Sequence, residues 1–245
     1  MTVEVADSIQ EHMDLLVSCT LGQMETPVDT SQTEHCRFHF LYLAETLVSE
    51  SVDLFPAYLG WAKIMLESRY KDFELGETLQ YVGNAIEQCL PKNVSGLAIA
   101  PINESKGLVT TLPSHIRPFI ESKQAHADLA EKYLRCLLNG QKRDASQLIT
   151  QAAEHLSVKT IYSEIFHPCQ YEVGRLWQLS QISVAQEHYC TAATQLIMSQ
   201  LYPRLFSRES NGRTFIGACI GNNMHEIGAR MVCDFLETEG WDTHY

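Results

Sequence analysis

The stretch FIGACIGNNMHEIG, residues 215–228, decides how the last part of the chain folds. Its first six residues form a short, continuous apolar run, which is typical of a β-strand buried on both faces. Apolar residues then recur at helical spacing, with Ile227, Met231 and Phe235 on one face. Residues 241–245 are expected to enter a second strand, so the order strand, helix, strand predicts the opening of a βαβ unit.

The loop between that strand and helix carries the motif Asn223-x-His225-x-x-Gly228. Imidazole is the commonest protein metal ligand, and a neighbouring side chain can orient its second nitrogen. Gly228 is expected to let the helix pack closely on its strand. His225 is therefore a candidate metal ligand; the alternatives are a helix cap or a histidine at a domain surface.

Helical periodicity dominates the chain before this point. Helices are expected over residues 5–20, 33–50, 54–69, 76–90, 117–139, 143–155, 158–178 and 184–206. Residues 91–113 are rich in Pro and Gly, which predicts a linker. The last four helices have short connections, which is typical of an antiparallel bundle, and a polar break at 207–212 follows them. We therefore expect three segments: a helical module with its linker (1–112), a four-helix bundle (113–208) and the start of a β-α domain (209–245).

The chain is acidic, with 18 basic and 30 acidic residues and a formal net charge of −12. This balance excludes a nonspecific nucleic-acid binder, although an acidic protein can reach DNA through a partner. No apolar run is long enough to span a bilayer and no leader segment is evident, so we expect a cytoplasmic protein that binds no membrane. The eight cysteines form no C-x-x-C pair and are expected to be small buried hydrophobes.

Two helix ends in the predicted bundle bring chemically distinct side chains together. Ser183 and Gln186 fit a capping box, which places Glu187 and His188 in the first turns of the last bundle helix. Trp177 lies near the end of the preceding helix. A flat aromatic surface beside a hydrogen-bond acceptor suits a ligand with a stacked base and ribose hydroxyls. The alternatives are a core tryptophan and two ordinary helix-surface residues.

Together these motifs resemble a known family. Trp177, nine further residues and then Glu187-His188 are similar to the W-x9-EH pattern in the helical cap of CarH-type B12 photoreceptors. The motif around His225 resembles the (D/E)-x-H-x-x-G motif that opens their Rossmann-like (flavodoxin-like) cobalamin-binding domain. The resemblance covers about residues 120–245 and leaves the first hundred residues unexplained. It implies a mainly α chain: a helical module, a four-helix-bundle cap and the first β-α of a Rossmann-like domain.

The resemblance also implies residue roles. His225 would ligate the cobalt from below, with the dimethylbenzimidazole tail displaced, and Asn223 and Gly228 would complete the lower motif. Trp177 would shield the upper ligand, Glu187 would hydrogen-bond an adenosyl group, and Val184 and His188 would line the pocket. Whether or not a ligand binds, we expect Val184 in the core. Adenosylcobalamin is the favoured cofactor, and methylcobalamin is the other candidate.

Three positions depart from the family pattern. Asn223 stands where the family usually has an acid, so we expect a weaker or more labile cobalt–histidine bond. Gln178 stands where some light-sensing members have a histidine that captures cobalt after photolysis, which rules out a bis-histidine photoproduct there. The sequence also ends before the serine- and glycine-rich loops that cradle the nucleotide tail. We expect residues 1–245 alone to bind cobalamin poorly, unless they are a piece of a longer protein.

The preferred hypothesis is a cobalamin-binding sensor without enzymatic activity, a light-responsive regulator in signal transduction. Because no basic recognition helix is evident, we expect its output to be contact with a regulatory protein, such as a transcription factor, or self-association, with no direct nucleic-acid binding. The runner-up is a corrinoid methyl carrier of a methyltransferase system, which also has a helical cap and a cobalt-binding histidine. A third hypothesis is a helical interaction module with an incidental β-α segment.

Overall fold

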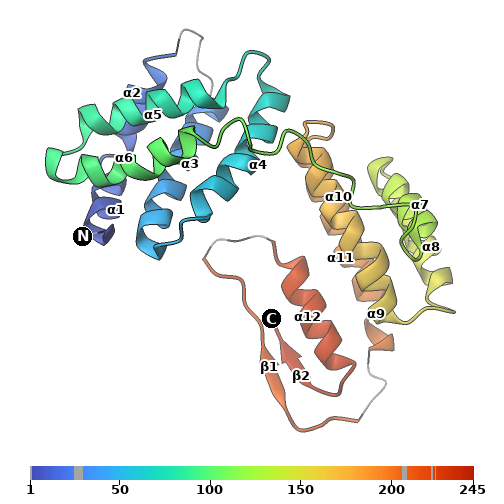
Figure 1. Cartoon of the computed structure of the whole chain (residues 1–245). Coiled ribbons are helices and arrows are strands. Elements are labelled where there is room, and N and C mark those ends of the chain that lie inside the picture. The colour runs from blue at the N-terminus through green and yellow to red at the C-terminus, as the bar shows by residue number, and fades with distance from the viewer. Residues whose placement is uncertain (1, 25–29, 206–208, 222, 224) are drawn as a thin grey trace. The chain divides into compact units, whose positions relative to one another are not determined.

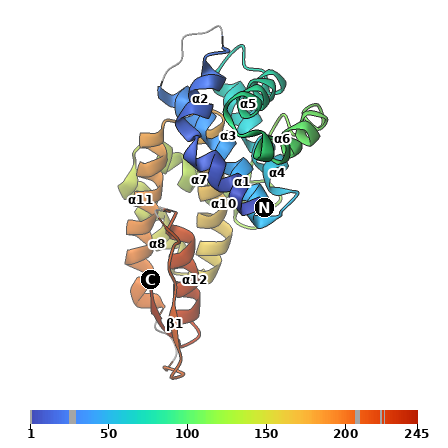
Figure 2. The same ribbon diagram turned by 90° about the vertical axis from the view of Figure 1, so that its left-hand side faces the viewer.

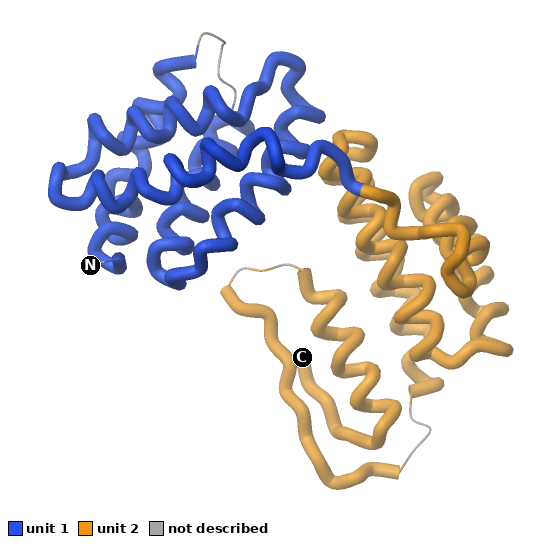
Figure 3. Tube along the Cα trace, viewed as in Figure 1, with its two compact units in different colours: residues 1–116 blue, residues 117–245 orange. Residues whose placement is uncertain are grey.

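A computed structural model describes residues 2–24, 30–205, 209–221, 223 and 225–245. The described chain is mainly helical and has one two-stranded parallel sheet (Figure 1), which confirms the predicted fold class. It divides into two compact units, residues 1–116 and 117–245 (Figure 3). We describe each by itself, and the division into three segments stays a prediction. No described helix combines the length and the apolar character needed to cross a membrane.

Unit 1 is built from six helices among its described residues. They are α1 (Thr2–Glu11), α2 (Met13–Leu21), α3 (Thr30–Ser49), α4 (Leu54–Arg69), α5 (Leu75–Cys89) and α6 (Lys92–Lys106). Their apolar faces meet in a core that contains the fully buried Phe40, Phe55 and Leu79. The single helix expected over 5–20 is two helices that meet at His12.

The predicted linker at residues 91–113 is wrong over most of its length, because α6 occupies Lys92–Lys106. Pro91 precedes the helix with φ −55°, a conformation suited to a helix start. Pro101 lies inside the helix and removes one backbone donor. Ala98 and Ile102 are completely buried in the core of unit 1. Packing of this apolar face outweighs the low helix propensity of proline and glycine.

Unit 2 begins with the predicted bundle. Its helices are α7 (Ala127–Leu138), α8 (Lys142–Ala152), α9 (Val158–Ile161), α10 (His167–Gln178) and α11 (Val184–Leu201), with a π turn η1 (Tyr162–Phe166) and a 3-10 turn η2 (Tyr202–Arg204). Helices α7, α8, α10 and α11 run alongside one another (Figures 1 and 2). The last helix was predicted to reach Phe206, which lies outside the described residues, as do the first two residues of the break at 207–212.

Two local features of the bundle differ from the expected helices. The helix expected from residue 117 begins at Ala127. Pro118 disfavours the helical conformation at residue 117, and His126 has a left-handed φ of 58° directly before the helix. The helix expected over 158–178 is continuous but contains the π turn η1. Pro168 has no N–H to donate to the carbonyl four residues earlier. The helix therefore changes, just before Pro168, to the π pattern, in which hydrogen bonds join residues five apart.

The end of unit 2 is the predicted strand-helix-strand. β1 (Thr214–Ile216) pairs in parallel with β2 (Asp242–His244), and α12 (Ile227–Glu237) connects them. The expectation of a strand buried on both faces is wrong in this structure, because Ile216 is 75% and Ile220 is 92% exposed. The helix covers one face of a sheet that has two strands among the described residues.

Helix α12 shares one hydrophobic core with the bundle. Met231 belongs to the buried cluster of the bundle, and Ile227 and Phe235 pack against that cluster. Tyr162 in the π turn donates a hydrogen bond of 2.7 Å to Asp234 Oδ2 on α12. The two halves of unit 2 are therefore joined by apolar packing and by a buried polar contact.

Candidate functional site

The connection from α10 to α11 sets the upper part of the candidate site. Trp177 lies in the last turn of α10, and Ser183 caps α11. The Ser183 hydroxyl accepts a hydrogen bond from Gln186 N at 3.2 Å, and Gln186 Oε1 accepts one from Ser183 N at 3.0 Å. This confirms the predicted capping box and fixes where the first turn of α11 begins.

Ser180 closes the end of α10 in a left-handed conformation, with φ 56°. Gln181 N donates to Leu176 O at 2.8 Å, and a hydrogen bond between residues five apart is typical of such helix ends. A side chain with a Cβ is strained at this φ, whereas glycine is not.

We therefore expect Ser180→Gly to raise the free energy of unfolding of unit 2 by about 0.5–1 kcal/mol, as measured by urea unfolding. Gln181→Gly is the matched control, since Gln181 is not among the residues with positive φ, and it should bring no gain. A loss of stability in Ser180→Gly would contradict the strain.

The structure places four of the predicted residues at this end of the helix pair. Trp177 is half-buried, and Glu187 has 25% of its side chain exposed. His188 is exposed, and its Nδ1 pairs with Glu187 Oε2. Val184 is 53% exposed, so its expected place in the core is wrong: it is the first residue of α11. These side chains are accessible to a ligand.

A chain of hydrogen bonds runs inward from Glu187. Thr191 Oγ1 donates to Glu187 Oε1 at 3.1 Å and lies 3.2 Å from Gln170 Oε1 on α10. Gln170 Nε2 donates to Thr194 Oγ1 at 2.9 Å, and the same oxygen lies 2.9 Å from the hydroxyl of Tyr133, which is fully buried. A continuous series of hydrogen bonds therefore connects the carboxylate of Glu187 with the buried interior of the bundle.

The lower part of the candidate site is His225 and Asn223. Asn223 Oδ1 accepts a hydrogen bond from His225 N and one from His225 Nδ1, both at 2.9 Å. The backbone N–H can only donate, which identifies the Asn223 atom as the amide oxygen. Because an amide oxygen only accepts, Nδ1 carries the ring proton, and the lone pair of Nε2 is free to bind a metal. The His225 side chain does not cap α12, whose start has no side-chain cap.

A metal held here would need further ligands from elsewhere. Among the described residues, no group of three or more His, Cys, Asp or Glu side chains is placed to hold a metal ion. A corrin ring brings its own equatorial nitrogens and would take at most one axial ligand from the protein below the ring. A single imidazole at His225 is the donor set that the cobalt of a corrinoid would accept from the protein.

The expected role of Gly228 in close helix packing is wrong. A Cβ placed on Gly228 would meet nothing within 4 Å. The close approach between strand and helix is at Gly217, where a Cβ would lie 3.1 Å from Cys233 Sγ on α12. Gly228 is exposed in the first turn of α12, three residues after His225.

If a glycine is needed at 228 to let a ligand come near the backbone, its substitution should affect binding and not folding. We expect Gly228→Ala to leave the melting temperature unchanged or slightly raised and to lower cobalamin affinity by about tenfold or more. Gly76 is the second residue of α5, as Gly228 is of α12, and a Cβ there also meets nothing within 4 Å. Gly76→Ala should leave both quantities unchanged. Equal cobalamin affinity in both variants would remove Gly228 from the site.

Side-chain contacts fix the lower part relative to helix α11. Gln195 Nε2 donates to Glu226 Oε1 at 2.9 Å, and Arg230 Nη2 donates to Ser199 Oγ at 2.8 Å. Glu226 directly follows His225. Gln195 lies eight positions after Glu187 on α11, a rise of about 12 Å. Glu187 and the residue that contacts Glu226 therefore lie about two helical turns apart along α11.

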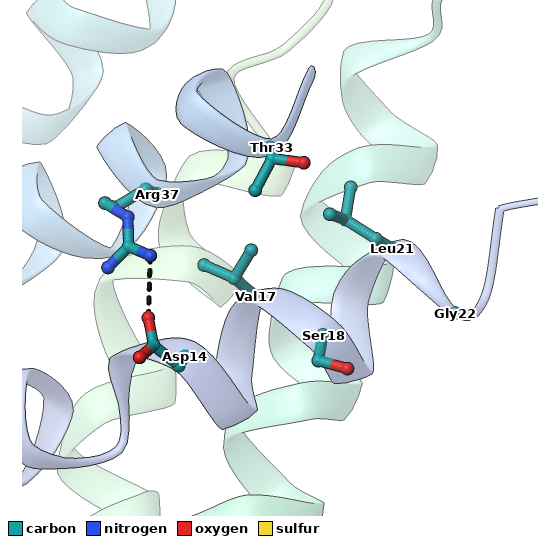
Figure 4. Close-up of a pocket in the computed structure, with 7 residues that line it drawn as sticks. All are labelled: Asp14, Val17, Ser18, Leu21, Gly22, Thr33 and Arg37. Carbon is teal, nitrogen blue, oxygen red and sulfur yellow. Dashed lines mark hydrogen bonds and ion pairs between the residues drawn. The ribbon is translucent and has the colours of Figure 1, made fainter. Parts of the chain in front are cut away.

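Unit 1 has a hollow between α2 and α3 that is not a comparable site. Figure 4 shows its lining residues, and its two charged side chains, Asp14 and Arg37, pair with each other at 2.7 Å. Asp14 has 91% of its side chain exposed.

The buried His39 of unit 1 bonds to the Tyr58 hydroxyl, and burial lowers the pKa of His39 to about 4. It is a neutral core histidine.

The sequence alone did not single out Gln170, Thr191 or Gln195. Thr191 lies four residues after Glu187, a spacing that places both on one face of a helix and is the signal that identifies it. Gln170 and Gln195 show no such signal, since their partners are distant in sequence or on another element.

A comparison with known protein families finds a match within the helical bundle of unit 2. Residues 129–202 match the model of a protein family described as a B12 binding domain. No curated protein and no solved structure matches the chain. The matched residues include Trp177, Val184, Glu187 and His188 and end before His225. The match supports a cobalamin-binding domain family for this part of the chain.

Proposed function

We propose that unit 2 binds cobalamin between the α10–α11 end and the loop that carries His225. The observation that carries this proposal is the orientation of His225, whose Nδ1 is bonded to Asn223 Oδ1 and whose Nε2 has no hydrogen-bond partner among the described residues. The family match over residues 129–202 supports the same cofactor from the other half of the unit. His225 would be the lower axial ligand, and Asn223 would hold its ring.

Trp177, Val184, Glu187 and His188 would surround the upper ligand. The indole would cover an adenine ring, and the Glu187 carboxylate would accept hydrogen bonds from ribose hydroxyls. A methyl group offers neither a ring to stack nor a hydroxyl to bond. These side chains therefore favour adenosylcobalamin over methylcobalamin.

The function that we propose is a light-responsive cobalamin sensor. Bound adenosylcobalamin supplies a cobalt–carbon bond that light can break. Trp177 and Glu187 would hold the upper group in darkness and would lose this contact in light, so the packing of α10 and α11 would differ between the two states. Unit 1, or the exposed faces of unit 2, would pass this difference to a regulatory protein or to a second copy of the chain.

The test is to load the complete gene product with adenosylcobalamin in darkness. Its absorbance spectrum and oligomeric state are then recorded before and after illumination. A light-dependent change of both supports the sensor. If the protein binds cobalamin but its spectrum and oligomeric state do not change on illumination, the result would contradict the sensor and favour the corrinoid methyl carrier.

A further inference from the structure

We propose that Thr191 and Gln170 are positioning residues that hold the Glu187 carboxylate for an upper ligand with hydroxyl groups. The inference rests on the proposed cobalamin site and names residues beyond those of the W-x9-EH pattern. It concerns which upper ligand the site prefers. Neither residue would touch the cobalt or the corrin ring.

Two hydrogen bonds determine the direction of the Glu187 carboxylate. Thr191 Oγ1 donates to its Oε1 at 3.1 Å, and His188 Nδ1 pairs with its Oε2. His188 has 75% of its side chain accessible, so fewer neighbouring atoms constrain it. Thr191 is half-buried and one helical turn from Glu187, and is the firmer of the two supports.

Gln170 in turn determines the direction of the Thr191 hydroxyl. The Gln170 amide is oriented by its Nε2, which donates to Thr194 Oγ1 at 2.9 Å. Thr194 is fully buried and donates to Cys190 O at 2.9 Å, so its oxygen can only accept from Gln170. The Gln170 carbonyl must then face Thr191, at 3.2 Å.

The Thr191 hydroxyl has one proton and two acceptors, Glu187 Oε1 and Gln170 Oε1. When a ligand hydroxyl donates to Glu187, the Thr191 proton can turn to Gln170, so no acceptor is left unpaired. This exchange occurs only with a ligand that brings a hydroxyl donor. Methylcobalamin brings none at this position.

The helix geometry places Gln170 on the same side of α10 as Trp177. The two residues are seven apart, which is two helical turns. The aromatic surface and the amide that supports the carboxylate therefore share one face of α10. A ligand that stacks on Trp177 would have its polar side toward Glu187.

The experiment measures the affinity of the complete gene product for adenosylcobalamin and for methylcobalamin in darkness. Thr191→Val keeps the shape of the side chain and removes the hydroxyl, and Thr191→Ser restores the hydroxyl. Gln170→Met removes the amide at similar size. The control is Thr150→Val on α8, where the hydroxyl donates to Ser146 O, also four residues earlier.

We expect Thr191→Val and Gln170→Met to weaken adenosylcobalamin binding at least fivefold and to leave methylcobalamin binding within twofold. Thr191→Ser should restore the parent ratio of the two affinities, and Thr150→Val should not change it. An equal loss for both cobalamins, or no loss, would overturn the positioning role. If the parent protein binds neither cobalamin, the proposed function itself fails, and the variants are not the cause.

Discussion

His225→Ala in the complete gene product should lower the affinity for cobalamin about 100-fold or more. In the structure Asn223 Oδ1 orients the His225 ring through Nδ1, and no group of three or more metal-ligating side chains is found among the described residues. Without this imidazole, the cobalt would keep water or its own nucleotide base as the lower ligand. The measurement is an absorbance titration with hydroxocobalamin and methylcobalamin.

Two further variants make this result specific. His244→Ala removes an exposed histidine of β2 in the same unit and should leave the titration unchanged. Asn223→Asp adds a charge to the group that holds the His225 ring and should raise the affinity, because a carboxylate makes the imidazole a stronger donor. A parent-like titration for His225→Ala would show that the cobalt is not bound there.

Tyr162→Phe should lower the free energy of unfolding of unit 2 by about 1–3 kcal/mol, because it leaves a buried carboxylate without its hydrogen-bond donor. The Tyr162 hydroxyl donates to Asp234 Oδ2 at 2.7 Å, Tyr162 is fully buried and Asp234 is 3% exposed. The nearest cation, Arg230, has its Nε 4.0 Å from the same oxygen. Hydrogen exchange of the α12 amides measures the loss locally. Tyr189→Phe, which removes an exposed hydroxyl, should cost less than about 0.5 kcal/mol.

The loss in Tyr162→Phe should also depend on pH. Burial raises the pKa of Asp234 above its ordinary value, and the hydrogen bond from Tyr162 opposes this. A carboxyl group with a higher pKa in the folded state binds protons more tightly when folded. It therefore adds stability as the pH falls and removes it as the pH rises through the interval between the unfolded and folded pKa values.

Without Tyr162 the pKa of Asp234 should rise further. The difference in stability between parent and variant should then be largest above the folded pKa of Asp234 and shrink as the pH falls through it. Asp234→Asn removes the charge, so adding Tyr162→Phe to it should cost less than in the parent. A loss that is independent of pH and unchanged in the double variant would contradict this account.

Sequence patterns predicted most helices because apolar residues at helical spacing form one buried face, whichever helices or strands that face packs against. The capping box at Ser183 and the parallel pairing of β1 with β2 were also predictable from local residues. Helix α6 was not, because the free energy that keeps Pro101 in a helix comes from tertiary packing. The late start of α7 was missed for a local reason: Pro118 disfavours the helical conformation at residue 117, and His126 adopts a left-handed φ directly before the helix.

The candidate site, like the fold, has parts that the sequence predicted and parts that it did not. The sequence motifs predicted that Trp177 and Glu187 lie at one end of a helix pair, and the structure places them there. Other contacts that support the unit join residues far apart in sequence, such as Tyr162 with Asp234 and Thr191 with Gln170. No periodicity encodes such pairs. Gly228 shows the limit of motif reading, since the expected close packing is at Gly217.

The most direct test of the central claim is electron paramagnetic resonance of the complete gene product loaded with cob(II)alamin. The protein is prepared once with ordinary histidine and once with histidine labelled by ¹⁵N in the ring. If His225 is the lower ligand, the nitrogen splitting of the cobalt signal changes with the isotope, and it no longer responds to the label in His225→Ala. A signal that is identical with and without the label, in protein that has bound the cofactor, would contradict the site described for unit 2.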